Sequence, residues 1–421
     1  MVVDIDLADT DDVGELFSQR AKIVRRSEIR ELLKLAEKPE VISFAGGFPD
    51  PATFPHEEFA ALAQKILTQD YAKALQYGAT EGDRLLREAV RDWLESEEGL
   101  RLPLEEVIIT SASQQGLDLI GKVFLDPGDL VFCDLPTYLG AIQAFSAYRA
   151  EKVGVPQHED GMDVDALEER IKEALRAGKR PKLIYLVPDF HNPTGITMSL
   201  AKRQRVLELA ERYNLIVIED NPYGKLRFEG ERLPSLKRLD ESGRVVTLLS
   251  FSKILCPGLR LAALIAPVKI AEQLVKLKQP TDLCTPMLTQ RLACEFIRSY
   301  DFKGHIARIT EIYRRKRDAM LSALEEHLPA HPQICWTRPQ GGFFVWLVLP
   351  EFVDTREMFP RAVEKNVAYV IGQAFFVDHS GQNTMRLSYS EPPPELIWEG
   401  IRRLAEVIEE EIAVASPRAI H

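Results

Sequence analysis

Lys253 lies in the stretch LLSFSKILCPGLR (248–260), directly after an apolar run that is typical of a buried strand. An ammonium group is costly to remove from water, so a lysine at such a position needs a reason. Two serines flank it, Ser250 and Ser252, and Arg260 follows a Pro-Gly turn. A lysine held in this way can serve as a nucleophile and a base once its amine is neutral.

Three further polar side chains follow apolar runs in the same manner. Asp220 ends LIVIED (215–220), Tyr223 comes just after it, and Asn192 lies in the loop HNPTG. In open α/β sheets, ligands bind outside the carboxyl ends of the strands. A lysine, a carboxylate, a phenol and an amide that converge at this edge can hold a heteroaromatic aldehyde.

The elements that must position these groups are short apolar runs that do not alternate with polar residues. Continuous apolar runs indicate strands covered on both faces, as in a parallel sheet. Helical patterns separate several of them, which predicts an α/β core with right-handed crossovers. The runs are VIIT (107–110), LVFCD (130–134), LIYLV (183–187), LIVIED (215–220), VVTLLSF (245–251) and LAALIAP (261–267).

The chain changes character near residue 270. Residues 271–326 predict long amphipathic helix broken near Pro280 and Pro286, and three later runs predict strands of a smaller sheet. A final helix over 395–415 carries the stripe Ile397, Ile401, Leu404, Ile408 and Ile412. We expect an α/β fold: a large domain with a mostly parallel sheet flanked by helices, plus a small α+β domain. The predicted parts are 1–40, an N-terminal arm and mobile helix that joins the small domain; 41–290, the large cofactor-binding domain; and 300–421, the small domain.

Composition excludes several classes of protein. The net charge of −11 argues against a nucleic-acid partner. No apolar run approaches the ~20 residues of a membrane helix, and the acidic N-terminus is unlike a secretion signal. Five scattered cysteines favour free thiols in the cytoplasm, and no metal site is predicted. Phosphate-loop, dinucleotide-binding and nucleophile-elbow motifs are absent.

The motifs SFSKILCPGLR, HNPTG and EDNPYG, in this spacing, resemble fold-type I pyridoxal-phosphate aminotransferases. IRELLKL, SFAGGFPDP, LQYG, SQQGLDL, CTPML, RPQGGFFVW and NTMRLSY resemble the subgroup of 2-aminoadipate and kynurenine aminotransferases. The resemblance implies a ping-pong transfer from an amino acid to a 2-oxo acid such as 2-oxoglutarate. The implied donors are 2-aminoadipate and glutamate, with leucine and aromatic amino acids as additions.

The resemblance also implies roles at the cofactor ring. Lys253 would bond to pyridoxal phosphate and move the substrate proton, while Asp220 would hold the ring nitrogen in its protonated form. Tyr223 and Asn192 would donate hydrogen bonds to the phenolic oxygen, and Tyr138 would stack on the ring. Taken alone, Asp220 and Asn192 also suit ordinary turns, and Tyr138 suits core packing.

A second implied set surrounds the phosphate. Ser113 and Gln114 begin a helix after VIIT, where free backbone N–H groups favour anions. Ser250, Ser252 and Arg260 would complete this phosphate site; strand alternation around Phe251 points both serines one way. Tyr77 would reach the phosphate of the neighbouring subunit, which implies a homodimer with shared active sites. The alternative for Tyr77 is a core tyrosine.

The implied substrate contacts involve Arg386, which would grip the α-carboxylate as a two-pronged donor, together with Asn192. Arg30, on the helix SEIRELLKL, would meet a distal carboxylate, and Gly46 and Gly47 would leave room beside the substrate. An exposed strand arginine and a solvated helix arginine are the plainer alternatives for Arg386 and Arg30.

Two other functions stay open at this point. A pyridoxal-phosphate carbon–sulfur lyase or racemase would keep the cofactor and break a different bond. An effector-sensing module of a transcription regulator would use the same fold without catalysis. The acidic charge and the roughly 40 residues before SFAGGFPDP disfavour the regulator, which needs a basic DNA-binding segment.

Overall fold

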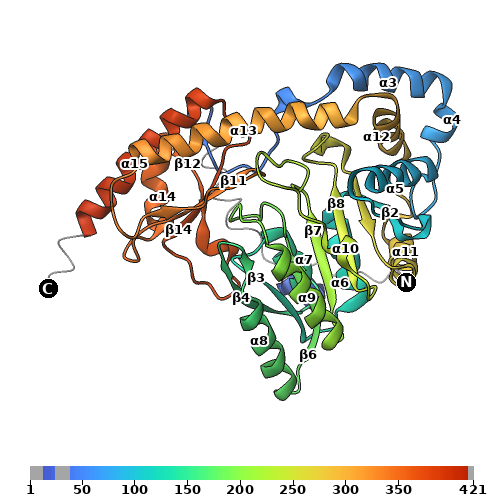
Figure 1. The fold of residues 1–421 in the computed structure, drawn as a ribbon, viewed down its shortest axis with the longest axis horizontal. Coiled ribbons are helices and arrows are strands. Elements are labelled where there is room, and N and C mark those ends of the chain that lie inside the picture. The colour runs from blue at the N-terminus through green and yellow to red at the C-terminus, as the bar shows by residue number, and fades with distance from the viewer. Residues whose placement is uncertain (1–12, 24–37, 416–421) are drawn as a thin grey trace, which may run out of the picture.

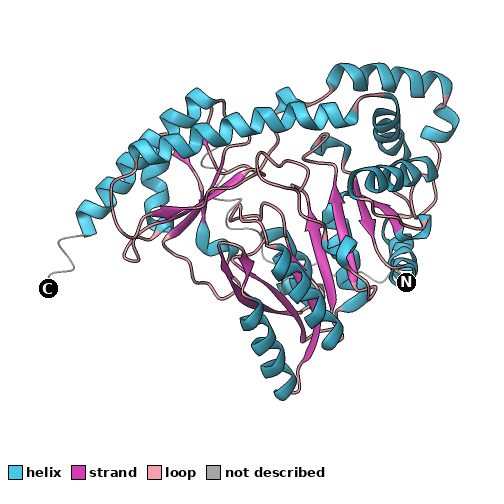
Figure 2. Cartoon of the chain, in the orientation of Figure 1, coloured by secondary structure: helices cyan, strands magenta, loops and turns pink. Residues whose placement is uncertain are grey.

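The computed structural model describes residues 13–23 and 38–415, which form β-sheets of eight, four and two strands enclosed by helices (Figures 1 and 2). The larger sheet has eight strands in the order β2-β9-β8-β7-β6-β3-β4-β5. Its strands are β2 (Val107–Thr110), β3 (Asp129–Leu135), β4 (Glu151–His158), β5 (Gly161–Met162), β6 (Arg180–Leu186), β7 (Ile216–Asn221), β8 (Val245–Ser250) and β9 (Ala262–Ile265).

The central strands β4, β3, β6, β7 and β8 are parallel, whereas β9, β2 and β5 pair in the antiparallel sense. The predicted mostly parallel sheet is therefore confirmed. The prediction found six of these strands and missed β4 and β5, because only Val155 of β4 is buried and β4 carries no continuous apolar run.

Helices cover both faces of this sheet, and alternate strand residues face each layer. Ile218 of β7 packs towards α6 (Ala112–Phe124), α7 (Leu139–Ser146) and α11 (Val268–Asp282). Val217 packs towards α8 (Val164–Arg176), α9 (Leu200–Arg212) and α10 (Leu236–Leu239) on the other face. The two faces of β7 therefore belong to different cores.

The predicted helix break near Pro280 is displaced. Helix α11 continues through Pro280 and ends at Asp282, followed by Leu283 in a left-handed conformation (φ 61°). Proline lacks the backbone N–H and crowds the preceding turn, and the helix ends two residues after it. Helix α12 (Met287–Ser299) then begins after Pro286, as predicted.

The smaller sheet is antiparallel, in the order β10-β11-β14-β13. Its strands are β10 (Cys335–Trp336), β11 (Phe344–Val348), β13 (Val370–Ile371) and β14 (Thr384–Ser388). Helices α13 (Phe302–His327), α14 (Thr355–Glu364) and α15 (Pro394–Ala415) enclose its core. The predicted stripe of α15 is confirmed: its first four members are fully buried and Ile412 packs against that core.

Two elements connect the large and small parts. Strand β1 (Ile42–Ser43) pairs in parallel with β12 (Val367–Ala368) in a two-stranded sheet, so residues assigned to the large domain by the predicted boundary at 41 pair with the small part. Helix α13 runs along the top of Figure 1, and its two halves enter different cores. The α/β fold with a small α+β part is confirmed, while the domain boundaries stay a prediction.

The remaining helices pack at the far end of the large sheet or lie in the N-terminal segment. They are α1 (Gln19–Ile23), α3 (His56–Gln69), α4 (Tyr71–Ala74) and α5 (Arg84–Glu98). No helix in the described ranges is long and apolar enough to cross a membrane.

Candidate active site

Lys253 lies in the turn that follows β8, and its side chain is only partly exposed. Its Nζ donates a hydrogen bond of 2.7 Å to the carbonyl oxygen of Gly47. Burial, reinforced by the positive charges of Arg386 and Arg260, lowers the pKa of Lys253 to about 8. A substantial share of this amine is therefore neutral near pH 8, which is the form that attacks a carbonyl or takes up a proton.

Asp220 is the penultimate residue of β7 and is 3% exposed. Its Oδ2 accepts a hydrogen bond of 2.9 Å from the hydroxyl of Tyr185 on the neighbouring strand β6. Its Oδ1 is buried without a hydrogen-bond partner. Burial raises the pKa of Asp220 to about 7, and the hydrogen bond from Tyr185 opposes this rise. The unpartnered Oδ1 is suited to a buried, positively charged N–H donor.

Arg386 joins the two parts of the molecule. From the middle of β14, its Nη1 donates to Asn192 Oδ1 (2.9 Å) and its Nη2 donates to the carbonyl of Ala45 (2.8 Å). The guanidinium lies 4.3 Å from the ring centre of Phe344 and 5.2 Å from that of Phe375. Burial lowers its pKa to about 10. A desolvated guanidinium backed by aromatic rings is a strong site for a carboxylate.

Two tyrosines line the same space. Tyr223 is buried against Phe343 and Phe344, and burial first, then Tyr138, raises the pKa of its phenol while Arg386 opposes the rise. Tyr138 lies at the start of α7 with its ring over Gly140. A side chain at Gly140 would come within 2.7 Å of that ring, so the glycine gives the tyrosine its place.

The side chains expected at the phosphate lie partly where α6 begins. Ser113 is in the first turn of that helix, and its Oγ is buried without a partner. Gln114 donates to the carbonyl of Gly140 (3.1 Å). Ser250 and Ser252 are both buried, and the N–H of Ser252 donates to Ser250 Oγ (3.2 Å). An orphaned hydroxyl on a helix N-terminus suits an anion.

One detail of the serine pair differs from the sequence interpretation. Strand β8 ends at Ser250, so Ser252 lies in the following turn and strand alternation does not orient it. Arg260 adopts a left-handed backbone conformation (φ 50°) after Pro257-Gly258 and is exposed. Its charge nevertheless acts on Lys253. Turn geometry, rather than strand pleating, brings these groups towards the lysine.

Tyr77, expected at the phosphate of a neighbouring subunit, is 79% exposed on the surface of the chain. Arg30 lies outside the described residues. Gly47 is part of the cluster through its carbonyl oxygen, which meets Lys253, while a side chain at Gly47 would come within 3.0 Å of the Phe344 ring.

Sequence reasoning missed Tyr185 and the Phe343–Phe344 pair. Tyr185 lies within the apolar run LIYLV and is fully buried, where its hydroxyl needs a hydrogen-bond partner. That requirement was the available signal, and Asp220 meets it. Nothing in the spacing alone indicates that Phe343 and Phe344 would back both Tyr223 and Arg386.

The observed groups fit pyridoxal phosphate. The unpartnered Asp220 Oδ1 matches a protonated ring nitrogen, the unpartnered Ser113 Oγ at a helix start matches a phosphate, and the Lys253 amine matches an aldehyde. These groups come from β7, α6 and the turn after β8, at the carboxyl edge of the large sheet.

Comparison with known proteins supports the same interpretation of the site. The pattern of the family described as "Aminotransferase class I and II" matches residues 39–404. The "Aromatic-amino-acid aminotransferase 1" of Thermococcus litoralis is 46% identical over 405 residues, which are 96% of this chain and 97% of that protein. The "2-aminoadipate transaminase" of Thermus thermophilus is 45% identical over 398 residues, covering 94% and 97%.

A solved structure agrees in shape. The crystal structure of Pyrococcus horikoshii kynurenine aminotransferase, in complex with PMP and with KYN and KYA as substrate and product, is similar with a TM-score of 0.92. It shares 45% sequence identity, and the match covers 96% of this chain and 99% of that one.

Proposed function

The chain belongs to the class I and II aminotransferase family, and from that premise we propose its substrates and the roles of its residues. It is a pyridoxal-phosphate-dependent aminotransferase. The proposed donors are 2-aminoadipate and glutamate, with leucine and aromatic amino acids in addition, and the proposed acceptor is 2-oxoglutarate. Relatives named for aromatic amino acids and for 2-aminoadipate, at 46% and 45% identity, support this breadth.

When bound, pyridoxal phosphate supplies an aldehyde that takes up the amino group and a ring that withdraws electrons from the bond being broken. Lys253 Nζ is the group that attaches this cofactor and moves the substrate proton. Its pKa, lowered to about 8, leaves a substantial share of the amine neutral and ready to accept that proton near pH 8. Asp220 Oδ1 holds the proton of the ring nitrogen, which maintains the ring's electron demand.

The observed positions of the side chains support the remaining proposed contacts to the ring and the phosphate. Tyr223 and Asn192 donate to the phenolic oxygen, and Tyr138 covers the ring. The phosphate contacts come from the start of α6 and from the turn after β8: Ser113, Gln114, Ser250, Ser252 and Arg260.

Arg386 binds the substrate α-carboxylate with Asn192 beside it. The single observation that carries this assignment is the buried guanidinium, whose Nε has no partner and whose Nη1 meets Asn192 Oδ1 at 2.9 Å. Both substrates of the cycle carry an α-carboxylate, so one arginine serves both half-reactions.

We also propose a homodimer in which Tyr77 reaches the phosphate of the partner subunit. Tyr77 is highly exposed. Three other large apolar side chains are exposed as well: Tyr71 and Leu75, which are close to it in the sequence, and Phe48, which follows Gly47. Such residues are expected at an interface. Mixing Lys253→Ala with Tyr77→Phe subunits tests the shared site. In a hybrid dimer one site would carry both changes and the other neither, so the activity per site should change. A fully active monomer would refute it.

The proposed compartment is the cytoplasm. All five cysteines are free thiols, as expected in a reducing environment. Localisation of the tagged full chain in its own cells tests this.

A panel of amino donors with 2-oxoglutarate tests the function. We expect glutamate formation with 2-aminoadipate, leucine and aromatic amino acids, each giving a 2-oxo acid with its carbon skeleton intact. Pyruvate and ammonia would instead indicate the lyase. Arg30→Ala should lower kcat/KM for 2-aminoadipate by roughly tenfold, or about 1.4 kcal/mol, and leave leucine nearly unchanged. Equal losses for both donors would make Arg30 structural.

A further inference from the structure

A second polar cluster lies on the face of the large sheet opposite Asp220. Asp134 near the end of β3 is 2% exposed, and His191 in the loop before Asn192 is 1% exposed. Their side chains connect through Thr194 to Gln157 on β4. No step of the proposed reaction uses these residues.

Hydrogen-bond directions fix where the protons are. The hydroxyl of Thr194 donates its single hydrogen to the amide oxygen of Gln157 (2.7 Å). Thr194 Oγ1 is also 2.9 Å from His191 Nδ1. Since the hydroxyl has no second hydrogen, it accepts there, and Nδ1 carries the proton of the imidazole.

The other ring nitrogen faces a carboxyl group. His191 Nε2 lies 3.5 Å from Asp134 Oδ2, while Asp134 Oδ1 accepts from Gln157 Nε2 at 3.4 Å. A neutral imidazole protonated on Nδ1 presents a lone pair at Nε2. An ionised carboxylate would present a second lone pair, and two buried acceptors repel each other. One proton must therefore lie between them.

Burial decides which partner holds that proton. It raises the pKa of Asp134 to about 8 and lowers the pKa of His191 to about 3. Both directions disfavour a charged pair in a site with little water. The neutral arrangement places the proton on Asp134 Oδ2, facing His191 Nε2 at 3.5 Å, a buried nitrogen that otherwise has no hydrogen-bond partner.

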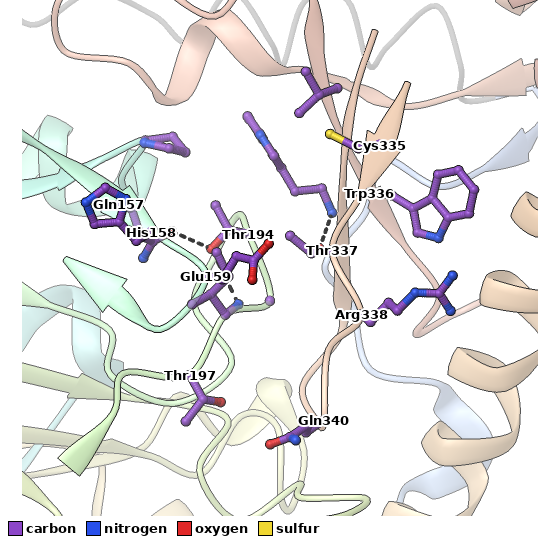
Figure 3. Close-up of a pocket in the computed structure, with 15 residues that line it drawn as sticks. Gln157, His158, Glu159, Thr194, Thr197, Cys335, Trp336, Thr337, Arg338 and Gln340 are labelled. Atoms are coloured by element: carbon purple, nitrogen blue, oxygen red, sulfur yellow. Dashed lines mark hydrogen bonds between the residues drawn. The ribbon is translucent and has the colours of Figure 1, made fainter. Parts of the chain in front are cut away.

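Asp134 and His191 are buried, and their partners Thr194 and Gln157 border a cavity. Figure 3 shows Thr194 and Gln157 joined on one wall of a cavity of about 780 Å³, with Thr337 and Arg338 of the small part on the opposite wall. Asp134 and His191 lie behind that wall and do not line the cavity. The proton is thus shielded from exchange with bulk water.

The cluster joins two segments that carry active-site residues. Asp134 is followed by Tyr138 at the start of α7. His191 directly precedes Asn192, whose Oδ1 holds the Arg386 guanidinium. This chain of polar contacts would hold Asn192 in place relative to Tyr138 from the far face of the sheet.

We propose that Asp134 and His191 form a neutral, proton-sharing pair that positions Asn192, and through it Arg386, for binding substrate carboxylates. They are positioning residues, since neither touches substrate or cofactor. This inference rests on the proposed role of Arg386 in the aminotransferase reaction.

Three variants of the cofactor-loaded enzyme test it, with glutarate as an unreactive dicarboxylate probe. Asp134→Asn places an N–H where the shared proton lies, so glutarate affinity and KM should stay within about threefold of wild type. Asp134→Ala leaves Nε2 buried and unpaired, so glutarate affinity should fall by roughly tenfold and both substrate KM values should rise similarly. Thr194→Val should act in the same direction and serves if Asp134→Ala does not fold.

A matched control lies on the same strand. Asp129, at the opposite end of β3, is fully buried and paired with Arg180 at 2.7 Å. Asp129→Ala should lower Tm without changing glutarate affinity, which separates general destabilisation from positioning.

Three outcomes are informative. If Asp134→Asn behaves like Asp134→Ala, the pair is ionised and the proposed proton position is wrong. If both Asp134→Ala and Thr194→Val bind glutarate like wild type, the cluster does not position the site. If the wild-type chain transfers no amino group at all, the proposed function fails independently of this inference.

Discussion

Glu219 and Asp220 are adjacent residues on strand β7, and both carboxyl groups are buried, yet their surroundings differ in kind. Glu219 faces α10 and accepts three hydrogen bonds, from the N–H of Leu236 (2.7 Å), the N–H of Lys237 (3.1 Å) and the hydroxyl of Thr247 (2.8 Å). Asp220 faces the other side of the sheet and accepts only the hydroxyl of Tyr185, with one oxygen left without a partner.

The difference distinguishes structural from functional burial. Burial raises the pKa of both carboxyl groups, but the donors around Glu219 satisfy its oxygens within the protein. Asp220 Oδ1 remains a hydrogen-bond acceptor that only a ligand can satisfy. Burying this oxygen without a partner costs folding free energy in the free protein. An incomplete hydrogen-bond shell therefore identifies the active face of this strand, where burial alone does not.

The sharpest contrast comes from neutralising each carboxyl group in turn. Asp220→Asn should reduce kcat by about 10²–10³-fold, because it removes the charge that holds the ring nitrogen's proton, with little change in Tm. Glu219→Gln should lower the free energy of unfolding by about 2–3 kcal/mol and leave activity per folded molecule unchanged. Steady-state kinetics and thermal melts of both variants check this. Similar kinetic losses in the two variants would remove the distinction.

Arg386 extends the same contrast to the small sheet. Arg386→Leu should lower kcat/KM by roughly 10²-fold for the amino acid and the 2-oxo acid alike, because both lose charge-assisted hydrogen bonds to their α-carboxylates. Arg386→Lys keeps the charge without the planar fork and should recover part of the loss. An effect confined to one substrate would assign Arg386 another role.

Tyr223 and Tyr313 offer a smaller test between two buried phenols. Tyr223→Phe keeps the packing on Phe343 and should lower kcat by about tenfold, the value of one hydrogen bond. Tyr313 also packs on Phe343, with ring centres 4.6 Å apart, but its hydroxyl accepts from the N–H of Asp50. Tyr313→Phe should change Tm alone. Initial rates for both variants, normalised to folded protein, distinguish the catalytic role of Tyr223 from the structural role of Tyr313.

The pH dependence of cofactor capture gives the smallest effect. The rate at which apoenzyme attaches pyridoxal phosphate should rise through about pH 8 and then level, because raising the pH removes the proton from Lys253 and frees its amine. Arg386→Gln removes a positive charge that lowers this pKa, so the midpoint should move to higher pH. Stopped-flow absorbance across pH 6–10 measures the midpoint. A shift to lower pH would contradict the electrostatic account.

Much of this arrangement could be read from the sequence, because it depends on local patterns. Continuous apolar runs gave β6, β7 and β8, and polar residues directly after them gave Asp220 and Lys253. The stripe of α15 followed from helical periodicity. Strand β4, which is only partly buried, has no such pattern and was not predicted.

Other features depend on contacts between distant segments, which spacing does not encode. The bond from Tyr185 to Asp220, the carbonyl of Ala45 at Arg386 and the approach of His191 to Asp134 each join separate elements. Ser252 shows the same limit at short range, since the strand stopped two residues before it. The roles assigned to Tyr77 and Arg30 stay predictions.

The most direct test of the active face is to locate the lysine that carries the cofactor. Enzyme loaded with pyridoxal phosphate is reduced with borohydride, digested, and mapped by mass spectrometry. We expect the added mass on the peptide that contains Lys253, and no labelling or turnover in Lys253→Ala. Labelling of another lysine, such as the buried Lys278, or normal turnover by Lys253→Ala, would contradict the account.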